Sequence, residues 1–171
     1  VEQQVADIGI LGENMVHEKN KDVDILEQLG FAQCRLSLAI PKEDKYSGPA
    51  YFKGRKIATS YPRLLSEYLE KNGIKAEIEE ISGSVEIAPG IGLADAVCDI
   101  VSSGSTLMTN GLREVTTILK SQAVIIGNKY LSEEKKGILE KLLFRIRAVR
   151  SAKENKYILL NAHESSVPEI C

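Results

Sequence analysis

The spacing of short apolar runs along this chain is the feature that most restricts its fold. Each run is short, and glycine, proline or charged residues separate it from the next, which is typical of β-strands. We expect strands at about 6–11, 34–40, 55–59, 75–81, 97–101, 114–119, 122–127 and 157–161. Helix-like segments lie between several of these runs, and strands that alternate with helices indicate an α/β fold.

The first predicted helix begins at Tyr61, with Ser60 as its N-cap and Pro62 in its first turn. Gly73 is a suitable residue to end it. The residues that would form its apolar stripe are Leu64, Leu65, Tyr68 and Leu69.

The second predicted helix follows Ser132, and Glu133 and Glu134 favour its positively polarised start. Its outer face is rich in lysine and arginine, which we interpret as a solvated surface because acidic residues and the net charge of −2 offset them. Its predicted buried face consists of Ile138, Leu139, Leu142, Leu143, Ile146 and Val149.

Composition excludes several classes of protein. A net charge of −2 gives no nucleic-acid footprint, and no apolar run approaches the roughly 20 residues that cross a bilayer. Cys34, Cys98 and Cys171 are too few and too widely spaced for a disulfide framework or a metal site, which favours a reducing cytoplasm. With only His17 and His163 present, we expect neither a histidine-centred catalytic dyad nor a metal site.

A loop of small and hydroxyl residues follows the predicted strand at 97–101, which carries one acid, Asp99. Its residues are Ser102, Ser103, Gly104, Ser105 and Thr106. Such a loop exposes backbone N–H groups and hydroxyls, which suits a phosphate, especially beside a helix N-terminus. Gly104 matters because a side chain there would occupy phosphate space or forbid a positive φ. The alternatives are an ordinary turn and an acid that only caps the loop.

The stretch from Glu86 to Leu107 resembles the signature of ATP phosphoribosyltransferase, the enzyme that opens histidine biosynthesis. The resembling positions are Glu86, Gly92, Ala94, Val97, Asp99, Ile100, Ser103, Gly104, Thr106 and Leu107. Further segments resemble the same family in the same order, namely Ala6–Gly12 with Glu13–Asn14, Cys34–Pro41, Lys56–Pro62, Gly111–Val115 and Lys156–His163.

This resemblance implies two α/β lobes, like those of a periplasmic binding protein, with the substrates in the cleft between them. Residues 1–34 and 113–171 would form an incomplete first lobe, and residues 35–112 the second lobe with its phosphoribosyl pyrophosphate loop. The chain would then be a catalytic-region fragment of the long form of the enzyme, inactive by itself and part of a homo-oligomer when full-length.

The implied reaction joins N1 of the ATP adenine to C1 of phosphoribosyl pyrophosphate and releases pyrophosphate, assisted by Mg²⁺. No protein nucleophile and no protein metal ligand is implied. The implied substrate-binding residues are Asp99, Ser102, Ser103, Gly104, Ser105, Thr106, Leu107 and Glu86, the last near the nucleotide base. Two alternatives remain, a solute-binding protein for small anions without catalysis and an inactive folded piece.

Other polar residues have both a structural and a functional interpretation. Ser84 and Glu86 fit a second helix entry, and Asp95 fits a solvated helix position. Arg113 is suited either to meet a phosphate or to tie the hinge between lobes. The turn after Asp7, with Gly9 and Gly12, fits a tight strand end or a wall of the cleft.

Overall fold

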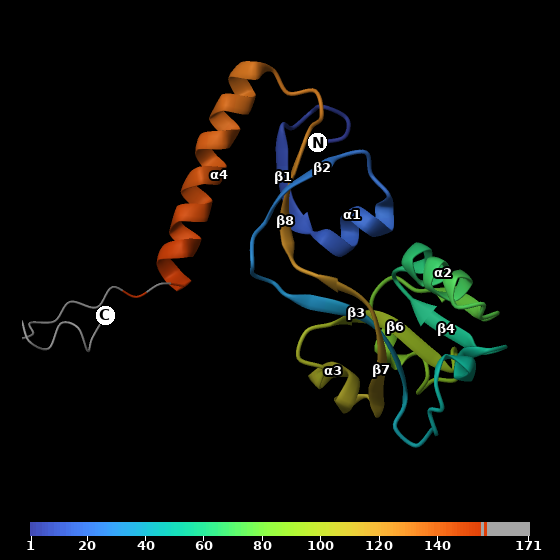
Figure 1. Cartoon of the computed structure of the whole chain (residues 1–171). Coiled ribbons are helices and arrows are strands. Elements are labelled where there is room, and N and C mark those ends of the chain that lie inside the picture. The colour runs from blue at the N-terminus through green and yellow to red at the C-terminus, as the bar shows by residue number, and fades with distance from the viewer. Residues whose placement is uncertain (155, 157–171) are drawn as a thin grey trace, which may run out of the picture. The chain divides into compact units, whose positions relative to one another are not determined.

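The computed structural model of the chain describes residues 1–154 and 156 (Figure 1). It contains two compact units, Val1–Tyr130 and Leu131–Cys171. The first unit holds two β-sheets and three of the helices, and the second holds helix α4. The α/β class expected from the sequence is confirmed.

The smaller sheet has three antiparallel strands in the order β1-β8-β2, which span Ile8–Gly12, Ala123–Gly127 and Asp24–Gln28. Central strand β8 is buried along its whole length. Helix α1, Glu13–Lys19, contributes Val16 to the small core that includes Val124 and Ile126. The sequence analysis missed β2, because only two of its residues are apolar and its pairing with β8 is what makes it a strand.

The larger sheet has five strands in the order β5-β4-β6-β3-β7. Strand β4 runs parallel to β5 and β6, and β3 runs antiparallel to β6 and β7. All five were expected from the sequence, and they span Glu77–Glu80, Lys56–Thr59, Ala96–Val101, Cys34–Pro41 and Leu112–Ser121. The strand predicted at 157–161 lies outside the described residues.

The larger sheet separates two apolar clusters. One contains Phe52 from the 3-10 helix η1, Pro49–Phe52, and Leu64, Leu65 and Leu69 from helix α2, Pro62–Lys71. The other includes Val85 from the 3-10 helix η2, Val85–Ile87, and Leu107 from helix α3, Ser105–Thr109. The loop at 102–106 is therefore fixed between β6 and the buried side chain of Leu107 on α3.

The chain crosses between the two sheets twice, from β2 to β3 and from β7 to β8 (Figure 1). Only Gln122 separates β7 from β8. The lobe boundaries expected from the sequence, 1–34 with 113–171 and 35–112, stay predictions.

Helix α2 confirms one predicted end and corrects the other. Gly73 ends it with a φ of +64°, and the N–H of Ile74 donates to Leu69 O at 2.9 Å, as in a Schellman motif. Ser60 is not the N-cap, because its hydroxyl donates to Ile81 O at 2.7 Å. The carboxylate of Glu18 on α1 instead accepts the N–H groups of Arg63 and Leu64, at 3.1 and 3.0 Å.

Helix α4, Glu133–Glu154, begins as expected, with the Ser132 hydroxyl accepting the N–H of Lys135 at 3.4 Å. Its predicted buried face is wrong for the most part, because Ile138, Leu142 and Val149 are 61%, 39% and 58% exposed, whereas Leu143 is buried. The periodicity identifies the apolar side of a helix, but not whether another element packs against it. No helix in the described part of the chain combines the length and apolar character needed to cross a membrane.

Candidate functional site

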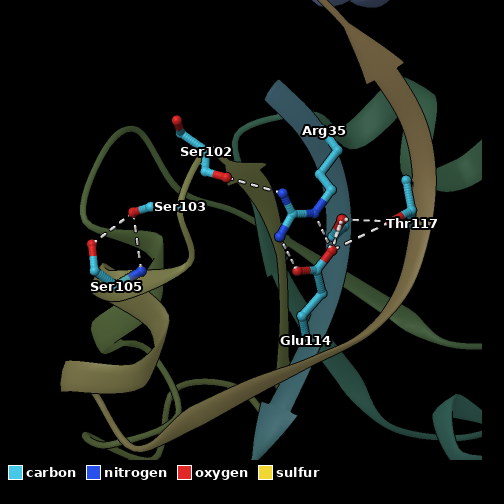
Figure 2. A network of polar contacts seen from close by, with 7 residues as sticks. Arg35, Ser102, Ser103, Ser105, Glu114 and Thr117 are labelled. Carbon is cyan, nitrogen blue, oxygen red and sulfur yellow. Dashed lines mark hydrogen bonds and ion pairs between the residues drawn. The ribbon is translucent and has the colours of Figure 1, made fainter. Parts of the chain in front are cut away.

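The loop after β6 has the open backbone that the sequence predicts for a phosphate cradle. Gly104 lies immediately before α3 with a φ of +84°, a conformation that side-chain-bearing residues rarely adopt. The Ser103 hydroxyl lies 2.9 Å from the Ser105 hydroxyl and accepts the N–H of Ser105 at 3.3 Å (Figure 2). Because α3 has only five residues, the local N–H and O–H groups define this site rather than a helix dipole.

Asp99 projects from β6 in a half-buried position. Its Oδ1 accepts the N–H of Ile100 at 2.8 Å, so it does not cap the loop that follows. Burial raises the pKa of this carboxyl, and the nearby negative charge of Glu86 raises it further. The structure thus places Glu86, which lies in η2, close enough to Asp99 for their charges to repel.

Two further residues named in the sequence analysis, Leu107 and Ser84, support the local fold. The Leu107 side chain is buried against the larger sheet, so it anchors α3 beneath the loop. Ser84 precedes η2 with a φ of +50° and makes no side-chain capping hydrogen bond. The predicted helix entry is therefore a short 3-10 turn that sets the position of Glu86.

A pocket of about 640 Å³ lies beside the loop, where the two sheets meet. Its position coincides with both crossings of the chain between the sheets. Ser102 is the loop residue that lines it. The lining residues are Glu13, Gln28, Gln33, Cys34, Arg35, Ser102, Lys120, Ser121 and Gln122.

Two cations of this pocket were not found by sequence reasoning. Arg35 on β3 and Lys120 on β7 are direct cross-strand partners. Like charges directly opposite one another are destabilising; the carboxylate of Glu114 offsets part of the charge of Arg35, and an anion in the pocket would offset the rest. Arg35 falls within the segment Cys34–Pro41 that resembles the family, but Lys120 had no sequence signal, because its role depends on the strand register.

Arg35 also connects the loop to the larger sheet (Figure 2). Its Nε and Nη2 donate to the two carboxylate oxygens of Glu114, at 2.6 and 2.5 Å, and its Nη1 donates to Ser102 O at 2.9 Å. The hydroxyls of Ser37 and Thr117 donate to Glu114 Oε1, at 2.7 and 3.3 Å. Together, and chiefly through Arg35, these donors lower the pKa of Glu114.

Asp95 and Arg113 have structural partners. The helix position expected for Asp95 from the sequence is wrong. It lies before β6, where its Oδ2 accepts the backbone N–H of Lys56 at 2.8 Å. Nη2 of Arg113 donates to Asp44 O at 2.7 Å, so this arginine ties β7 to the segment after β3.

The turn at Gly12 leads directly from β1 into α1, with ordinary backbone angles at that glycine. The backbone oxygen of Asp7 accepts the N–H of Asn128, an extension of the β1–β8 pairing. These positions match the strand-end interpretation of the segment. The wall of the cleft that the resemblance places here stays a prediction.

Helix α1 contributes polar residues that the sequence analysis did not single out. Asn14 donates from Nδ2 to the Tyr61 hydroxyl at 2.9 Å and accepts the Ser121 hydroxyl at 2.9 Å. Burial raises the pKa of Tyr61, and the charge of Asp99 adds to this increase. Asn14 and Tyr61 therefore form a polar contact between α1 and the start of α2, and the charge of Asp99 on β6 acts on this tyrosine.

Comparison with known proteins identifies the family. The model of the ATP phosphoribosyltransferase family, HisG, matches residues 1–148. The chain belongs to the ATP phosphoribosyltransferase family. The ATP phosphoribosyltransferases of Bacteroides thetaiotaomicron and Azobacteroides pseudotrichonymphae are 57% and 58% identical to it over 166 residues. These matches cover 97% of the chain and 59% of each relative's length.

Solved structures show the same relationship. The ATP phosphoribosyltransferase HisG:HisZ complex from Thermotoga maritima matches with a TM-score of 0.75 and 28% identity, over 86% of this chain and 71% of that one. The substrate-binding protein of an amino acid ABC transporter matches with a TM-score of 0.63 and 15% identity, over 90% and 69% of the two chains. The second likeness concerns the fold alone, and it agrees with the periplasmic-binding-protein-like architecture expected from the sequence.

Proposed function

We propose that the protein containing this chain transfers a phosphoribosyl group from phosphoribosyl pyrophosphate to N1 of ATP, in histidine biosynthesis. Family membership supports this reaction. The structural observation that carries it is the loop after β6, with a glycine at a φ of +84° and a half-buried carboxylate on the strand before it. This arrangement suits a phosphate bonded to a sugar.

The loop residues have separate roles in this proposal. The backbone N–H groups and hydroxyls of 102–106 hold the 5-phosphate, and buried Leu107 keeps α3 in place beneath them. Asp99 accepts hydrogen bonds from ribose hydroxyls, which are stronger for a charged acceptor. Glu86, beside Asp99, faces the nucleotide base.

The pocket beside the loop is suited to the charged ends of the substrates. Arg35 and Lys120 line it, and both phosphoribosyl pyrophosphate and ATP carry several negative charges. We therefore assign the pyrophosphate or triphosphate chain to this pocket.

The chemistry needs no protein nucleophile. The lone pair of adenine N1 forms a bond to C1 of the ribose, and the bond from C1 to the pyrophosphate oxygen breaks, with its electron pair leaving on pyrophosphate. The protein contributes orientation of two bound substrates, an effect worth up to about 7–11 kcal/mol. Its cations stabilise the charge of the leaving group.

Mg²⁺ is expected to bind mainly through substrate oxygens. In the part of the chain that the structure describes, no group of three or more carboxylate, histidine or cysteine side chains forms a cage for a metal ion. Mg²⁺ usually keeps several waters and binds phosphates together with one or two carboxylates. Asp99 and Glu86 are two carboxylates near the loop, and the bound ion would neutralise pyrophosphate charge.

The proposal extends to assembly and compartment. The Thermotoga maritima relative is described as a HisG:HisZ complex, and we propose a homo-oligomer for the protein that contains this chain. The free thiols of Cys34 and Cys98 support a reducing cytoplasm. No nucleic-acid or membrane partner is proposed.

Titration of the chain with phosphoribosyl pyrophosphate tests the proposal. Calorimetry with and without Mg²⁺ should show binding that strengthens with Mg²⁺. The backbone amide signals of Ser103 and Gly104 should shift in NMR spectra as ligand is added. Ribose 5-phosphate should shift the same signals, whereas ribose should not. Absence of binding, or shifts confined to residues far from the loop, would contradict the assignment.

A further inference from the structure

Arg35 makes three directed hydrogen bonds that join distant parts of the larger sheet. Two go to Glu114 on β7 and one goes to the carbonyl of Ser102, the first residue of the loop (Figure 2). The backbones of Arg35 and Val101 are paired across β3 and β6, so the side chain reaches one residue beyond its own partner. The loop is therefore held from the sheet side at its first peptide bond.

Glu114 fixes the direction in which this arginine points. A guanidinium is planar, and a two-point contact with a carboxylate sets its orientation as well as its position. The hydroxyls of Ser37 and Thr117 also donate to Glu114, so the carboxylate is itself immobilised. With Nε and Nη2 engaged, Nη1 can point only along one direction, and Ser102 O lies there at 2.9 Å.

The hydrogen bond to Ser102 O fixes the orientation of the whole peptide group between Ser102 and Ser103. A trans peptide is planar, so the C=O of one residue and the N–H of the next point in opposite directions. Holding the Ser102 carbonyl toward Arg35 therefore directs the Ser103 N–H away from the sheet. Among the described residues no acceptor is found for the backbone N–H groups of Ser103 and Gly104.

We propose that Arg35 and Glu114 are positioning residues that orient the Ser102–Ser103 peptide so that the loop's N–H groups face the phosphate. This inference rests on the proposed function, because it takes the loop to be the phosphate cradle. Glu114 acts through Arg35, and Arg35 acts through the backbone of Ser102. Neither needs to touch the substrate for the effect to operate.

A different role for Arg35 predicts that neutralising Glu114 changes the affinity for phosphoribosyl pyrophosphate in the opposite direction. Arg35 also lines the adjoining pocket, where the proposed function uses its positive charge, and the rival interpretation is that this charge is its whole contribution. In that case neutralising Glu114 would remove a competing negative charge and tighten the binding of phosphoribosyl pyrophosphate. If Glu114 orients the loop, the same change weakens binding.

The test compares Glu114→Gln with Glu79→Gln as a matched control. Glu79 also forms an ion pair within the larger sheet, with Lys56, and the two substitutions change the charge equally. Glu79 lies on edge strand β5, and β4 separates this strand from β6 and the loop that follows it, so the control is remote from the loop. We expect about a tenfold loss of affinity for phosphoribosyl pyrophosphate in Glu114→Gln, and none in Glu79→Gln.

A second readout does not depend on ligand. The ¹⁵N order parameters of Ser103 and Gly104 should be about 0.85 in the ligand-free parent chain and below about 0.6 in Glu114→Gln. Arg35→Lys should have the same effect, and the double variant should add little, because the two residues act as one unit. Chemical denaturation should show that the variants remain folded.

The outcomes separate the two claims. If the parent chain does not bind phosphoribosyl pyrophosphate, the proposed function fails, and the order parameters still decide whether the pair positions the loop. Unchanged order parameters in Glu114→Gln, or affinity that is equal or tighter than in the parent chain, would overturn the positioning role.

Discussion

At Asp99 the fold keeps a carboxylate in a half-buried position where its charged form is disfavoured. Within the described part of the chain, its side chain makes one hydrogen bond, accepting the N–H of neighbouring Ile100, which an asparagine oxygen can accept equally well. The charge therefore contributes nothing that the fold needs, which is the pattern expected of a residue retained for ligand binding.

We predict that Asp99→Asn weakens binding of phosphoribosyl pyrophosphate about tenfold or more, because hydrogen bonds to charged acceptors are worth about 1.5–3 kcal/mol. The pKa of Asp99 is raised in the folded state. Its contribution to the free energy of unfolding is therefore stabilising only at acid pH, and it is lost as the pH rises through the pKa of the folded state. The variant should thus be at least as stable as the parent chain at neutral pH, and the difference should fade in acid. Urea denaturation at both pH values and calorimetric titration measure this. Normal binding with a large loss of stability would make the acid structural.

Gly104 is predicted to matter for binding beyond its effect on stability. Gly104→Ala should cost about 1–2 kcal/mol of folding free energy, because φ is +84°. Gly54→Ala is the control, since Gly54 has a φ of +72° and open space around it, away from the loop. Both variants should lose similar stability in chemical denaturation, and only Gly104→Ala should lose affinity for phosphoribosyl pyrophosphate. Equal affinities would remove the loop from the site.

At the scale of elements, helix α2 obtains its N-terminal cap from another helix. Glu18 on α1 is buried and its two oxygens accept the N–H groups of Arg63 and Leu64. The carboxylate satisfies two backbone donors that have no partner within the helix. This contact, with the bond from Asn14 to Tyr61, joins α1 to the start of α2, which packs against the larger sheet.

We predict that Glu18→Ala lowers the free energy of unfolding by about 1–2 kcal/mol, the usual cost of losing an N-cap. Glu67→Ala is the matched control, because Glu67 lies on α2 itself in an exposed pair with Arg63. It should change stability by about 0.5 kcal/mol or less. Urea denaturation followed by circular dichroism gives both values. A loss no larger in Glu18→Ala than in Glu67→Ala would show that the cap contributes little.

At the scale of the whole molecule, we predict that the 171-residue chain alone binds substrate but forms no detectable phosphoribosyl-ATP. The three-stranded sheet leaves Ile10 and Ile25 exposed on its edge strands, at 63% and 38%. We expect this sheet to form one wall of the substrate cleft, and its exposed apolar edges to leave that wall loosely held. A loosely held wall lowers the effective concentration of one substrate against the other. Absorbance with both substrates and Mg²⁺ measures product, with the Bacteroides thetaiotaomicron relative as control. Turnover close to that of the relative would contradict this.

Local signals predicted much of the fold and identified the contiguous part of the candidate site. Asp99 and the loop after it are neighbours in sequence, so a strand followed by small residues was enough to find them. Strand β2, the cap of α2 and the exposure of α4 were missed or wrong, because each depends on which other element lies alongside. A serine before a helix can cap that helix or bond to another segment, as Ser60 does. An apolar stripe on a helix can be buried or exposed, as on α4.

The sequence by itself determined the alternation of strands and helices, the family, and the loop with its preceding acid. Only the tertiary structure decided which residues support that loop. Ser102 and Glu114 lie 67 and 79 positions after Arg35 along the chain. The three residues meet because β3 pairs with both β6 and β7. Residue types set local conformation, whereas strand register sets which distant side chains share a face. The register is a property of the whole sheet that no single segment encodes.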